Sequence, residues 1–574
     1  MVELAHSLKG YTTDQDKAVA PKETVARVRE LLETKHGGIL ESLERTDTGR
    51  LGIPVFISRF GPKALDLVPT RKQMGKGASP EQAEASALME LVERYSFFTF
   101  FNTPENFEEM IWTEAEKHFG DRLISLMEMR KSVNEILRDA DTRQTLDQMP
   151  WRFCKAVRPA DGSEHIVPAN YFKLLNEFNG SSAGNSLAET VMQGSCEVVE
   201  RHVCAVIDKT HPTLCTIGTA SIKDPVLLDL LDKFERNGIK VWLKDFSLGM
   251  PVPTVGALAY DPSTFPEKSE IVLTAGTASS PTKAAIRALT EVAQLAGDFE
   301  TNACYEPSGM SKPADLESIQ WLIDGPTMPL SSLPDVSNSD ILEEITSLAI
   351  GLQKMGYDLY AIDTTNPELG VPACYCFVPG FQFLERAKSP SLGLYVGRRL
   401  AEEYELERAV PGLKILSEIY EDAPFLSFFQ GLVNLKAEDP LLAQLKFDKA
   451  ADLQEVPEDR ALAYFYSAYA LTQSEAFNEA LPRLDKAIEL ESGVKEYYNL
   501  RGVCRFRRNE YELAAKDFEA AIKLDKGSVM DLANLGLCHK RLGNTAEAVR
   551  YLEAAIAIDG DLDFAIAELA EIIG

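Results

Sequence analysis

Three segments of the chain share a layout in which apolar residues recur with helical spacing after a small polar start. Each segment opens at a serine, and a proline follows that serine in the first and the third; the serines are Ser79, Ser186 and Ser280. Serine is favourable just before the first turn of a helix, and proline is favourable within that turn. The pattern therefore predicts that three helices begin at these serines.

Each predicted helix carries polar residues on one face and apolar residues around it. At about 100° per residue, positions i, i+4 and i+7 lie within roughly 60° of arc. The apolar surroundings indicate largely buried helices, where a carboxylate is costly unless it is paired or binds a metal ion. The three polar faces consist of Ser86, Glu90 and Glu93, of Gln193, Glu197 and Glu200, and of Arg287, Glu291 and Gln294.

Short apolar runs, typical of strands, mix with amphipathic helices up to about residue 395. A helix is expected over residues 22–34, and strands are expected within 51–57, 239–243, 254–259, 270–273 and 371–377. Residues 305–340 are rich in proline, serine and aspartate, which indicates loops. This mixture predicts one large α+β domain over residues 1–395.

Beyond residue 395 the strand pattern stops, and small residues recur with a period of 34. The recurring small residues are Ala468, Gly502 and Gly536, followed twelve positions later by Ala480, Ala514 and Ala548. Small side chains at this spacing let paired helices approach closely, as in tetratricopeptide repeats. We expect a helical linker over 396–423 and an all-α repeat domain over 424–574, with four helix pairs up to 562 and a capping helix.

The charge and the cysteine pattern exclude several classes of function. A net charge of −29 argues against binding to nucleic acid or to an anionic membrane surface. No run of 18 apolar residues occurs, and the start of the chain does not resemble a signal peptide, so we expect a cytoplasmic protein. The nine cysteines include no C-x-x-C pair, which favours reduced thiols over a zinc site.

The glutamates on the predicted helices suit a metal–phosphate site. Mg²⁺ takes oxygen ligands from carboxylates and from nucleotide phosphates, and helix starts rich in glycine and serine offer free N–H groups to anions. For one Glu-x-x-Glu-Arg motif alone, a solvated helix face would be the simpler interpretation. Two copies with the same upstream spacing, and a third variant, favour a site for Mg²⁺ and a nucleotide phosphate chain.

Several charged residues near these motifs keep two interpretations open. Glu189 stands three residues after Ser186 and is either half of a capping box or a ligand. Arg94, Arg201 and Arg287 either neutralise the carboxylates or bind phosphate. A lysine flanked by Gly75 and Gly77 belongs to no P-loop, since no G-x4-G-K-[ST] occurs in the chain.

The motifs together resemble the YcaO family over roughly residues 10–395. They are Gly75-Lys76-Gly77 before Glu90 to Arg94, Ser182-Ala183-Gly184-Asn185 before Glu197 to Arg201, and Arg287 to Gln294, supported by Gly52-Ile53-Pro54-Val55 and Val378-Pro379-Gly380. The resemblance implies an α+β ATP-binding fold, usually a homodimer. It also implies Mg²⁺-dependent use of ATP to activate a backbone amide of a peptide or protein, giving azolines, macroamidines or thioamides.

The resemblance also assigns expected roles to individual residues. The residues that match the Mg²⁺-binding carboxylates of the family are Glu90, Glu93, Glu189, Glu197 and Glu200. The residues expected to contact the nucleotide are Lys17, Thr24, Ser182, Asn185, Arg201, Arg287, Glu291 and Gln294. No catalytic residue that contacts the amide is identified.

Two departures bear on the reaction. Azoline-forming members often end in a Pro-x-Pro-x-Pro tail, whereas this chain continues into repeats, and many members have an arginine where Ala296 stands here. A YcaO domain followed by repeats looks more like a stand-alone enterobacterial member linked to methylthiolation of a ribosomal protein. We therefore expect ATP-dependent amide activation for thioamide- or azoline-type modification, with a protein partner on the repeats. The alternative is a nucleotide-binding accessory protein that assists ribosomal-protein methylthiolation.

Overall fold

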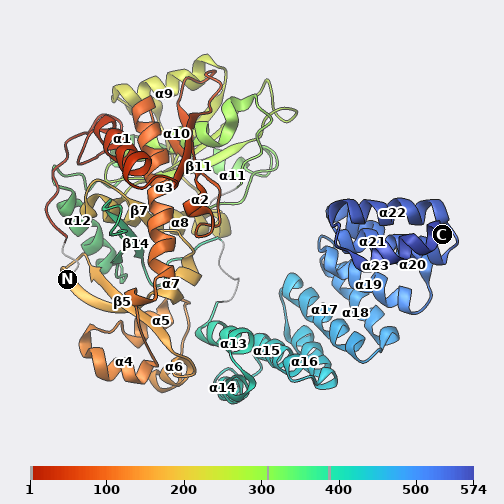
Figure 1. The fold of residues 1–574 in the computed structure, drawn as a ribbon. Coiled ribbons are helices and arrows are strands. Elements are labelled where there is room, and N and C mark those ends of the chain that lie inside the picture. Colours follow the sequence, from red (N-terminus) through yellow and green to blue (C-terminus); the bar gives the residue numbers. More distant parts are fainter. Residues whose placement is uncertain (1–3, 307–308, 385–389) are drawn as a thin grey trace. The chain divides into compact units, whose positions relative to one another are not determined.

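The computed structural model describes residues 4–306, 309–384 and 390–574 (Figure 1). The chain divides into two compact units. The first covers Met1–Asp139 and Pro150–Pro390, and the second covers Ala140–Met149 and Ser391–Gly574. Among the residues with described positions, none of the helices combines the length and the apolar character needed to cross a membrane.

Three sheets form the framework of the first unit. A three-stranded antiparallel sheet has the order β1-β2-β3, with bounds Leu40–Arg45, Val55–Phe60 and Lys72–Lys76. A second sheet has the order β11-β10-β9-β8-β12, with bounds Val272–Thr277, Thr254–Tyr260, Lys240–Asp245, Thr216–Ile217 and Thr327–Met328. The third has the order β4-β5-β13-β14-β7, with β6 paired to β5 and bounds Glu108–Met110, Trp151–Arg158, Tyr360–Asp363, Ala373–Phe377, Ser181–Ala183 and Ser163–Pro168.

One strand from each sheet leads directly into a long helix. β3 leads into α3 (Pro80–Asn102), β7 into α8 (Leu187–Thr210) and β11 into α10 (Pro281–Ala296). Three residues connect strand and helix in every case, and the last of the three is the serine before the first helical turn. The Ser79 and Ser186 side chains accept backbone hydrogen bonds from the first turns of α3 and α8. The prediction that helices begin at the three serines is confirmed.

The remaining helices of the first unit cover these sheets. They are α1 (Pro21–Arg29), α2 (Pro62–Leu65), α4 (Trp112–Phe119), α5 (Leu126–Lys131), α7 (Ala169–Asn176), α9 (Pro225–Arg236), α11 (Gln320–Ile323) and α12 (Ile341–Lys354). Short 3₁₀ turns occur at Pro104–Asn106, Gly120–Arg122, Thr219–Ser221, Gly297–Phe299 and Leu330–Ser332. The helix expected over 22–34 is α-helical only as far as Arg29, and Glu30–Lys35 continues as a π-helical turn.

The core of the first unit consists of apolar clusters around the three long helices. α3 packs against α1, β2, β3 and β7, while α8 packs against α12, β7, β11 and β14. α10 packs against α9, β10 and β11. Val198, Val199 and Val203 of α8 are fully buried, as expected for a helix that carries its polar residues on one narrow face.

The second unit is a run of helices that begins with α6 (Asp139–Leu146), α13 (Leu392–Glu403) and α14 (Leu406–Ile419). Four helix pairs follow, and α23 closes the run. Their bounds are α15 (Pro424–Lys436) with α16 (Pro440–Leu453), α17 (Pro457–Gln473) with α18 (Phe477–Leu490), α19 (Lys495–Arg507) with α20 (Tyr511–Leu524), α21 (Val529–Arg541) with α22 (Thr545–Ile558), and α23 (Asp563–Ile573). The fold is therefore the expected α+β domain followed by an all-α repeat solenoid.

Glycines explain the close packing within the pairs. A Cβ atom added at Gly431, Gly502 or Gly536 would lie 2.6–2.8 Å from a side-chain atom of the partner helix. That distance is shorter than any real Cβ contact, so a larger residue would push the two helices apart. The small residues of the 34-residue period thus have the role that the sequence predicts for them.

Candidate functional site

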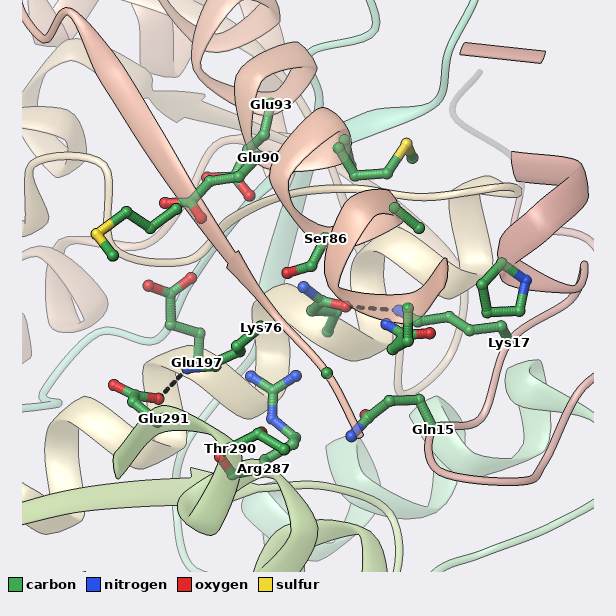
Figure 2. A pocket seen from close by; sticks show the side chains of 18 of the residues that line it. Gln15, Lys17, Lys76, Ser86, Glu90, Glu93, Glu197, Arg287, Thr290 and Glu291 are labelled. Atoms are coloured by element: carbon green, nitrogen blue, oxygen red, sulfur yellow. Dashed lines mark hydrogen bonds and ion pairs between the residues drawn. The ribbon is translucent and has the colours of Figure 1, made fainter. Parts of the chain in front are cut away.

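A cavity of about 310 Å³ in the first unit gathers the polar faces of α3, α8 and α10 (Figure 2). All nine residues of the three predicted faces line it. Six glutamates and five basic residues stand in its wall. These are Glu90, Glu93, Glu189, Glu197, Glu200 and Glu291, with Lys17, Lys76, Arg94, Arg201 and Arg287.

The repeated strand–helix connection explains why the carboxylates converge. Three residues separate each of the three helices from its strand. Residues at the same position along each helix therefore lie at the same distance from the end of the strand. Glu90, Glu197 and Glu291 all stand ten residues after the first residue of their helix. The same strand–helix connection, present three times, therefore places the carboxylates of Glu90, Glu197 and Glu291 in the same cavity.

Arg94 is a common partner of the two cavity glutamates of α3, Glu90 and Glu93. Ser181 donates a hydrogen bond of 2.6 Å to Glu93, and Arg94 lies 3.0 Å from the same carboxylate. Glu90 lies 3.8 Å from Arg94. The Arg94 guanidinium also stacks 3.8 Å above the centre of the Phe178 ring, which fixes its position. A single arginine thus serves two carboxylates.

The glutamates of α8 are held by backbone N–H groups. Glu200 accepts a hydrogen bond of 2.8 Å from the backbone N–H of Thr277 in β11, and Glu197 accepts one of 3.3 Å from Gly180. Arg201 lies 3.7 Å from Glu197. These contacts orient the carboxylates toward the cavity without neutralising both.

The carboxylates repel one another because they are buried together. Burial, with the nearby charges of Glu197 and Glu90, raises the pKa of Glu93 to about 8. Burial and the charge of Glu291 raise the pKa of Glu200 to about 7. Burial also raises the pKa of Glu90. Arg94 and Arg201 therefore compensate the carboxylates of this side only in part near neutral pH.

Further positive charge surrounds Glu291 of α10. Lys76 at the end of β3 forms an ion pair with Glu291 of α10 (Figure 2). Burial opposes ionisation of Glu291, but Lys76, Arg201 and Arg287 outweigh it and lower its pKa. The Nε of Arg287 is buried and has no hydrogen-bond partner among the described residues. It is a donor without an acceptor in the wall of an acidic cavity.

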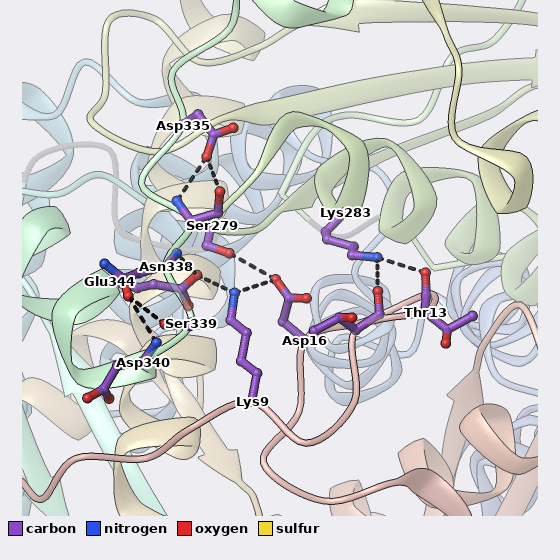
Figure 3. Close-up of polar contacts among 12 residues, drawn as sticks. Lys9, Thr13, Asp16, Ser279, Lys283, Asp335, Asn338, Ser339, Asp340 and Glu344 are labelled. Atoms are coloured by element: carbon purple, nitrogen blue, oxygen red, sulfur yellow. Dashed lines mark hydrogen bonds and ion pairs between the residues drawn. The ribbon is translucent and has the colours of Figure 1, made fainter.

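The N-terminal segment (residues 6–20) provides part of the cavity wall, and Figure 3 shows the polar contacts that hold it. Lys283 donates hydrogen bonds to the carbonyl oxygens of Thr12 and Thr13, at 2.7 and 2.8 Å. Lys9 lies 2.8 Å from Asp16 and 2.5 Å from Glu344 of α12. Ion pairs and backbone contacts thus fix a segment that has no helix or sheet of its own.

The two predicted nucleotide contacts near the N-terminus, Lys17 of this segment and Thr24 of α1, donate hydrogen bonds to α8 and to the turn before it. Lys17 donates a hydrogen bond of 2.8 Å to Gln193 and lies 3.6 Å from Glu189. Thr24 donates one of 2.9 Å to the side-chain oxygen of Asn185. All five residues line the cavity, so the structure brings the predicted N-terminal contacts to the predicted site.

Glu189 combines the two interpretations that the sequence left open. Its backbone N–H donates to the Ser186 hydroxyl, as in a capping box. Its carboxylate instead accepts hydrogen bonds from the N–H of Ala18, at 2.8 Å, and from Asn185. The carboxylate therefore ties the N-terminal segment to α8 and faces the cavity at the same time.

Ser182 is the one predicted contact that does not line the cavity. It lies in β7, pairs with Cys374 of β14 and is fully buried. The cavity wall contains its neighbour Ala183 instead. The strand periodicity that turns one side chain inward turns the next one away, and a motif alone does not tell which is which.

The donor set fits Mg²⁺ and a nucleotide. Within the described part of the chain, no three acidic, histidine or cysteine side chains are grouped as a complete metal site. Mg²⁺ usually binds one or two carboxylates together with phosphate oxygens and water, so a complete protein cage is not needed. The raised pKa values of Glu93 and Glu200 show that the nearby cations compensate these carboxylates only in part, and the buried Nε of Arg287 lacks an acceptor among the described residues. A metal ion and a phosphate chain would satisfy both.

Several residues of the cavity wall have no role predicted from the sequence. Thr290 follows the helical spacing of α10 one turn from Arg287, and this spacing could have identified it. Gln15 comes from the irregular N-terminal segment, for which periodicity gives no signal. The wall residues without a predicted role are Gln15, Val19, Pro21, Met74, Lys76, Gly77, Gln82, Ala85, Met89, Thr290 and Leu295.

Comparisons with known proteins identify the family of the first unit. The model of the family described as YcaO cyclodehydratase, ATP- and Mg²⁺-binding, matches residues 74–382, and a tetratricopeptide-repeat model matches residues 532–562. An uncharacterized protein of Methanothermobacter thermautotrophicus is 27% identical over 409 residues, covering 64% of this chain and 95% of that protein. The Escherichia coli protein named ribosomal protein S12 methylthiotransferase accessory factor YcaO is 25% identical over 341 residues, covering 53% of this chain and 56% of that protein.

A solved structure shows a related fold. It is described as a heterocyclase in complex with substrate and cofactor, and it superposes with a TM-score of 0.54 at 20% sequence identity. The superposition covers 67% of this chain and 54% of that one. At this identity the likeness concerns the fold.

Proposed function

The chain belongs to the YcaO family, and from that premise we propose that it phosphorylates a backbone amide oxygen of a peptide or protein. ATP and Mg²⁺ are its cofactors, in line with the family description. The observation that supports this reaction most directly is the cavity in which buried glutamates from three helices face five basic residues. Such a wall suits a metal ion and a phosphate chain held side by side.

The reaction follows from the chemistry of amides. An amide oxygen is a poor leaving group, and ATP with Mg²⁺ would supply the phosphoryl group that turns it into a good one. A Cys, Ser or Thr side chain of the substrate, or an external sulfide, would then attack the amide carbon and release phosphate. The product would be an azoline or a thioamide.

Residues in different parts of the cavity wall would have different roles in this reaction. The glutamates of α3 and α8 would hold the metal ion. Burial raises the pKa values of Glu93 and Glu200, and a cation bound beside them would stabilise their charged form. Arg287 would donate its free Nε to a phosphate oxygen. Lys17 and Thr24 would keep the N-terminal segment closed over the site through Gln193 and Asn185.

The repeat unit would hold the protein that carries the amide. Paired helices stacked in a row form an extended surface on which a peptide or a protein can lie. We also expect the homodimer that is usual in the family. Light scattering of the purified protein, which gives the mass in solution, tests that expectation.

The test uses the origin of the phosphate oxygen. The full-length protein is incubated in H₂¹⁸O with ATP, Mg²⁺ and the protein fraction of the source cells, and the released phosphate is analysed by mass spectrometry. Amide activation predicts that the phosphate released above the level of the same mixture without this protein carries no ¹⁸O, since its new oxygen comes from the amide. Simple hydrolysis would put ¹⁸O from water into this additional phosphate and would overturn the proposal.

A nucleotide-binding accessory protein is the second candidate function. The name of the Escherichia coli relative favours it, although the match covers 56% of that protein. An accessory protein would bind ATP in calorimetric titration but release no phosphate in the same mixture. Binding without turnover would therefore select this candidate.

A further inference from the structure

The two glycines of the Gly75-Lys76-Gly77 motif are explained by packing. A Cβ atom on Gly75 would lie 2.1 Å from the backbone nitrogen of Ala87, and one on Gly77 would lie 2.6 Å from that of Ala83. Both positions therefore require glycine so that β3 can lie directly on α3. Packing accounts for the glycines but leaves the lysine between them without a role.

Lys76 points away from α3, because neighbouring strand residues face opposite sides. It lines the cavity together with Met74 of the same strand. It shares this wall with carboxylates from three different helices, Glu90 of α3, Glu200 of α8 and Glu291 of α10, and it forms an ion pair with the last of them. The ammonium group therefore lies near the centre of the acidic cluster (Figure 2).

The present partner of Lys76 does not depend on it alone. Glu291 also lies in the field of Arg201 and Arg287, and both lower its pKa. The side chains of Lys76 and Glu291 are 20% and 16% exposed, so neither is sealed in the core. If Lys76 moved to another anion, two cations would still compensate Glu291. Because these two cations remain near Glu291, Lys76 can leave it at a small cost in free energy.

We infer that Lys76 is a phosphate-binding residue, which leaves Glu291 when nucleotide binds and contacts the terminal phosphate of ATP. The inference rests on the proposed function. The carboxylates that would hold Mg²⁺ line the same cavity as Lys76, so ATP bound there with the metal ion would bring its phosphates within reach of the lysine. Lysine is a common phosphate ligand and acts there as a point charge.

The test compares nucleotides that differ only in their phosphates. A non-hydrolysable ATP analogue, ADP and AMP are titrated with Mg²⁺ into the wild type, Lys76→Met and Lys76→Arg, by calorimetry. The matched control is Lys72→Met, since Lys72 lies on the same strand but is exposed. Thermal unfolding without nucleotide checks that each variant is folded.

Contact with the terminal phosphate predicts a selective loss. Lys76→Met should bind the ATP analogue at least tenfold more weakly and AMP within twofold of wild type. Lys76→Arg keeps the charge and should recover part of the loss, and Lys72→Met should change none of the three affinities. Equal weakening of all three nucleotides, or no weakening, would overturn the inference alone. A wild type that binds none of them would overturn the proposed function as well.

Discussion

Glu200→Gln removes a buried charge from the cavity and keeps the volume of the side chain. Glu200 is 8% exposed, and its carboxylate accepts a hydrogen bond of 2.8 Å from the N–H of Thr277. The amide oxygen of glutamine can accept the same bond. The variant therefore isolates the effect of the charge from the effect of the shape.

The magnitude follows from the pKa of Glu200. Burial and Glu291 raise this pKa from 4.5 to about 7. Between these two values the folded protein binds more protons than the unfolded chain, so stability falls as the pH rises through this window. The full difference corresponds to about 3 kcal/mol at pH 8 and to less than about 1 kcal/mol at pH 5. The neutral glutamine of the variant does not ionise, so its stability does not fall in this way.

The assay is thermal unfolding in the presence of EDTA at pH 5 and at pH 8. At pH 8 the variant should melt about 4 °C above wild type, because a unit of this size unfolds with an entropy of about 2 cal/mol/K per residue. At pH 5 the gap should be about 1 °C or less. Glu235→Gln, on the exposed side of α9, is the control and should leave the melting temperature unchanged at both pH values.

The same variant should bind Mg²⁺–ATP at least tenfold more weakly, since a proposed metal ligand has lost its charge. Higher stability and lower affinity together would identify a carboxylate that is retained for binding at a cost in stability. A variant that melts at or below the wild type at pH 8 would refute the reasoning. A gap of the same size at pH 5 would show that shape, and not charge, decides.

Three further predictions concern other parts of the chain. Lys283→Met removes two of the hydrogen bonds that hold the N-terminal segment; trypsin should then cut this segment several-fold faster, as followed by mass spectrometry. Gly502→Ala places a Cβ 2.8 Å from the Phe518 ring; it should destabilise the repeat unit by about 1–3 kcal/mol in thermal unfolding and leave ATP affinity unchanged. Iodoacetamide should label the exposed Cys304 long before the buried Cys196, whose pKa burial raises to about 12.

Local patterns were sufficient to predict most of the fold and much of the site. Ser79, Ser186 and Ser280 marked the helix starts, because a capping serine acts on its own first turn. The helical spacing then selected nine residues that line one cavity. The 34-residue period predicted the helix pairs for a similar reason: each repeat packs mainly against its neighbours.

Long-range contacts could not be predicted in this way. Nothing near Lys76 in the sequence indicates that its partner is Glu291, 215 residues away. The grouping of Ala140–Met149 with the C-terminal helices likewise depends on contacts between distant segments. Ser182 shows the limit of a motif, since its neighbour lines the cavity and its own side chain does not.

The acidic cluster is best understood as a consequence of the repeated strand–helix connection. A single buried helix with several uncompensated carboxylates would be too costly to fold. The carboxylates are instead distributed over α3, α8 and α10, and at least one carboxylate of each helix has a polar partner from another element: Ser181 for Glu93, a backbone N–H for Glu200, and Lys76 for Glu291. The charge of each helix is compensated in part, and the remaining repulsion arises where the three helices meet. The fold thus confines the electrostatic cost to the cavity, where a bound cation can offset it.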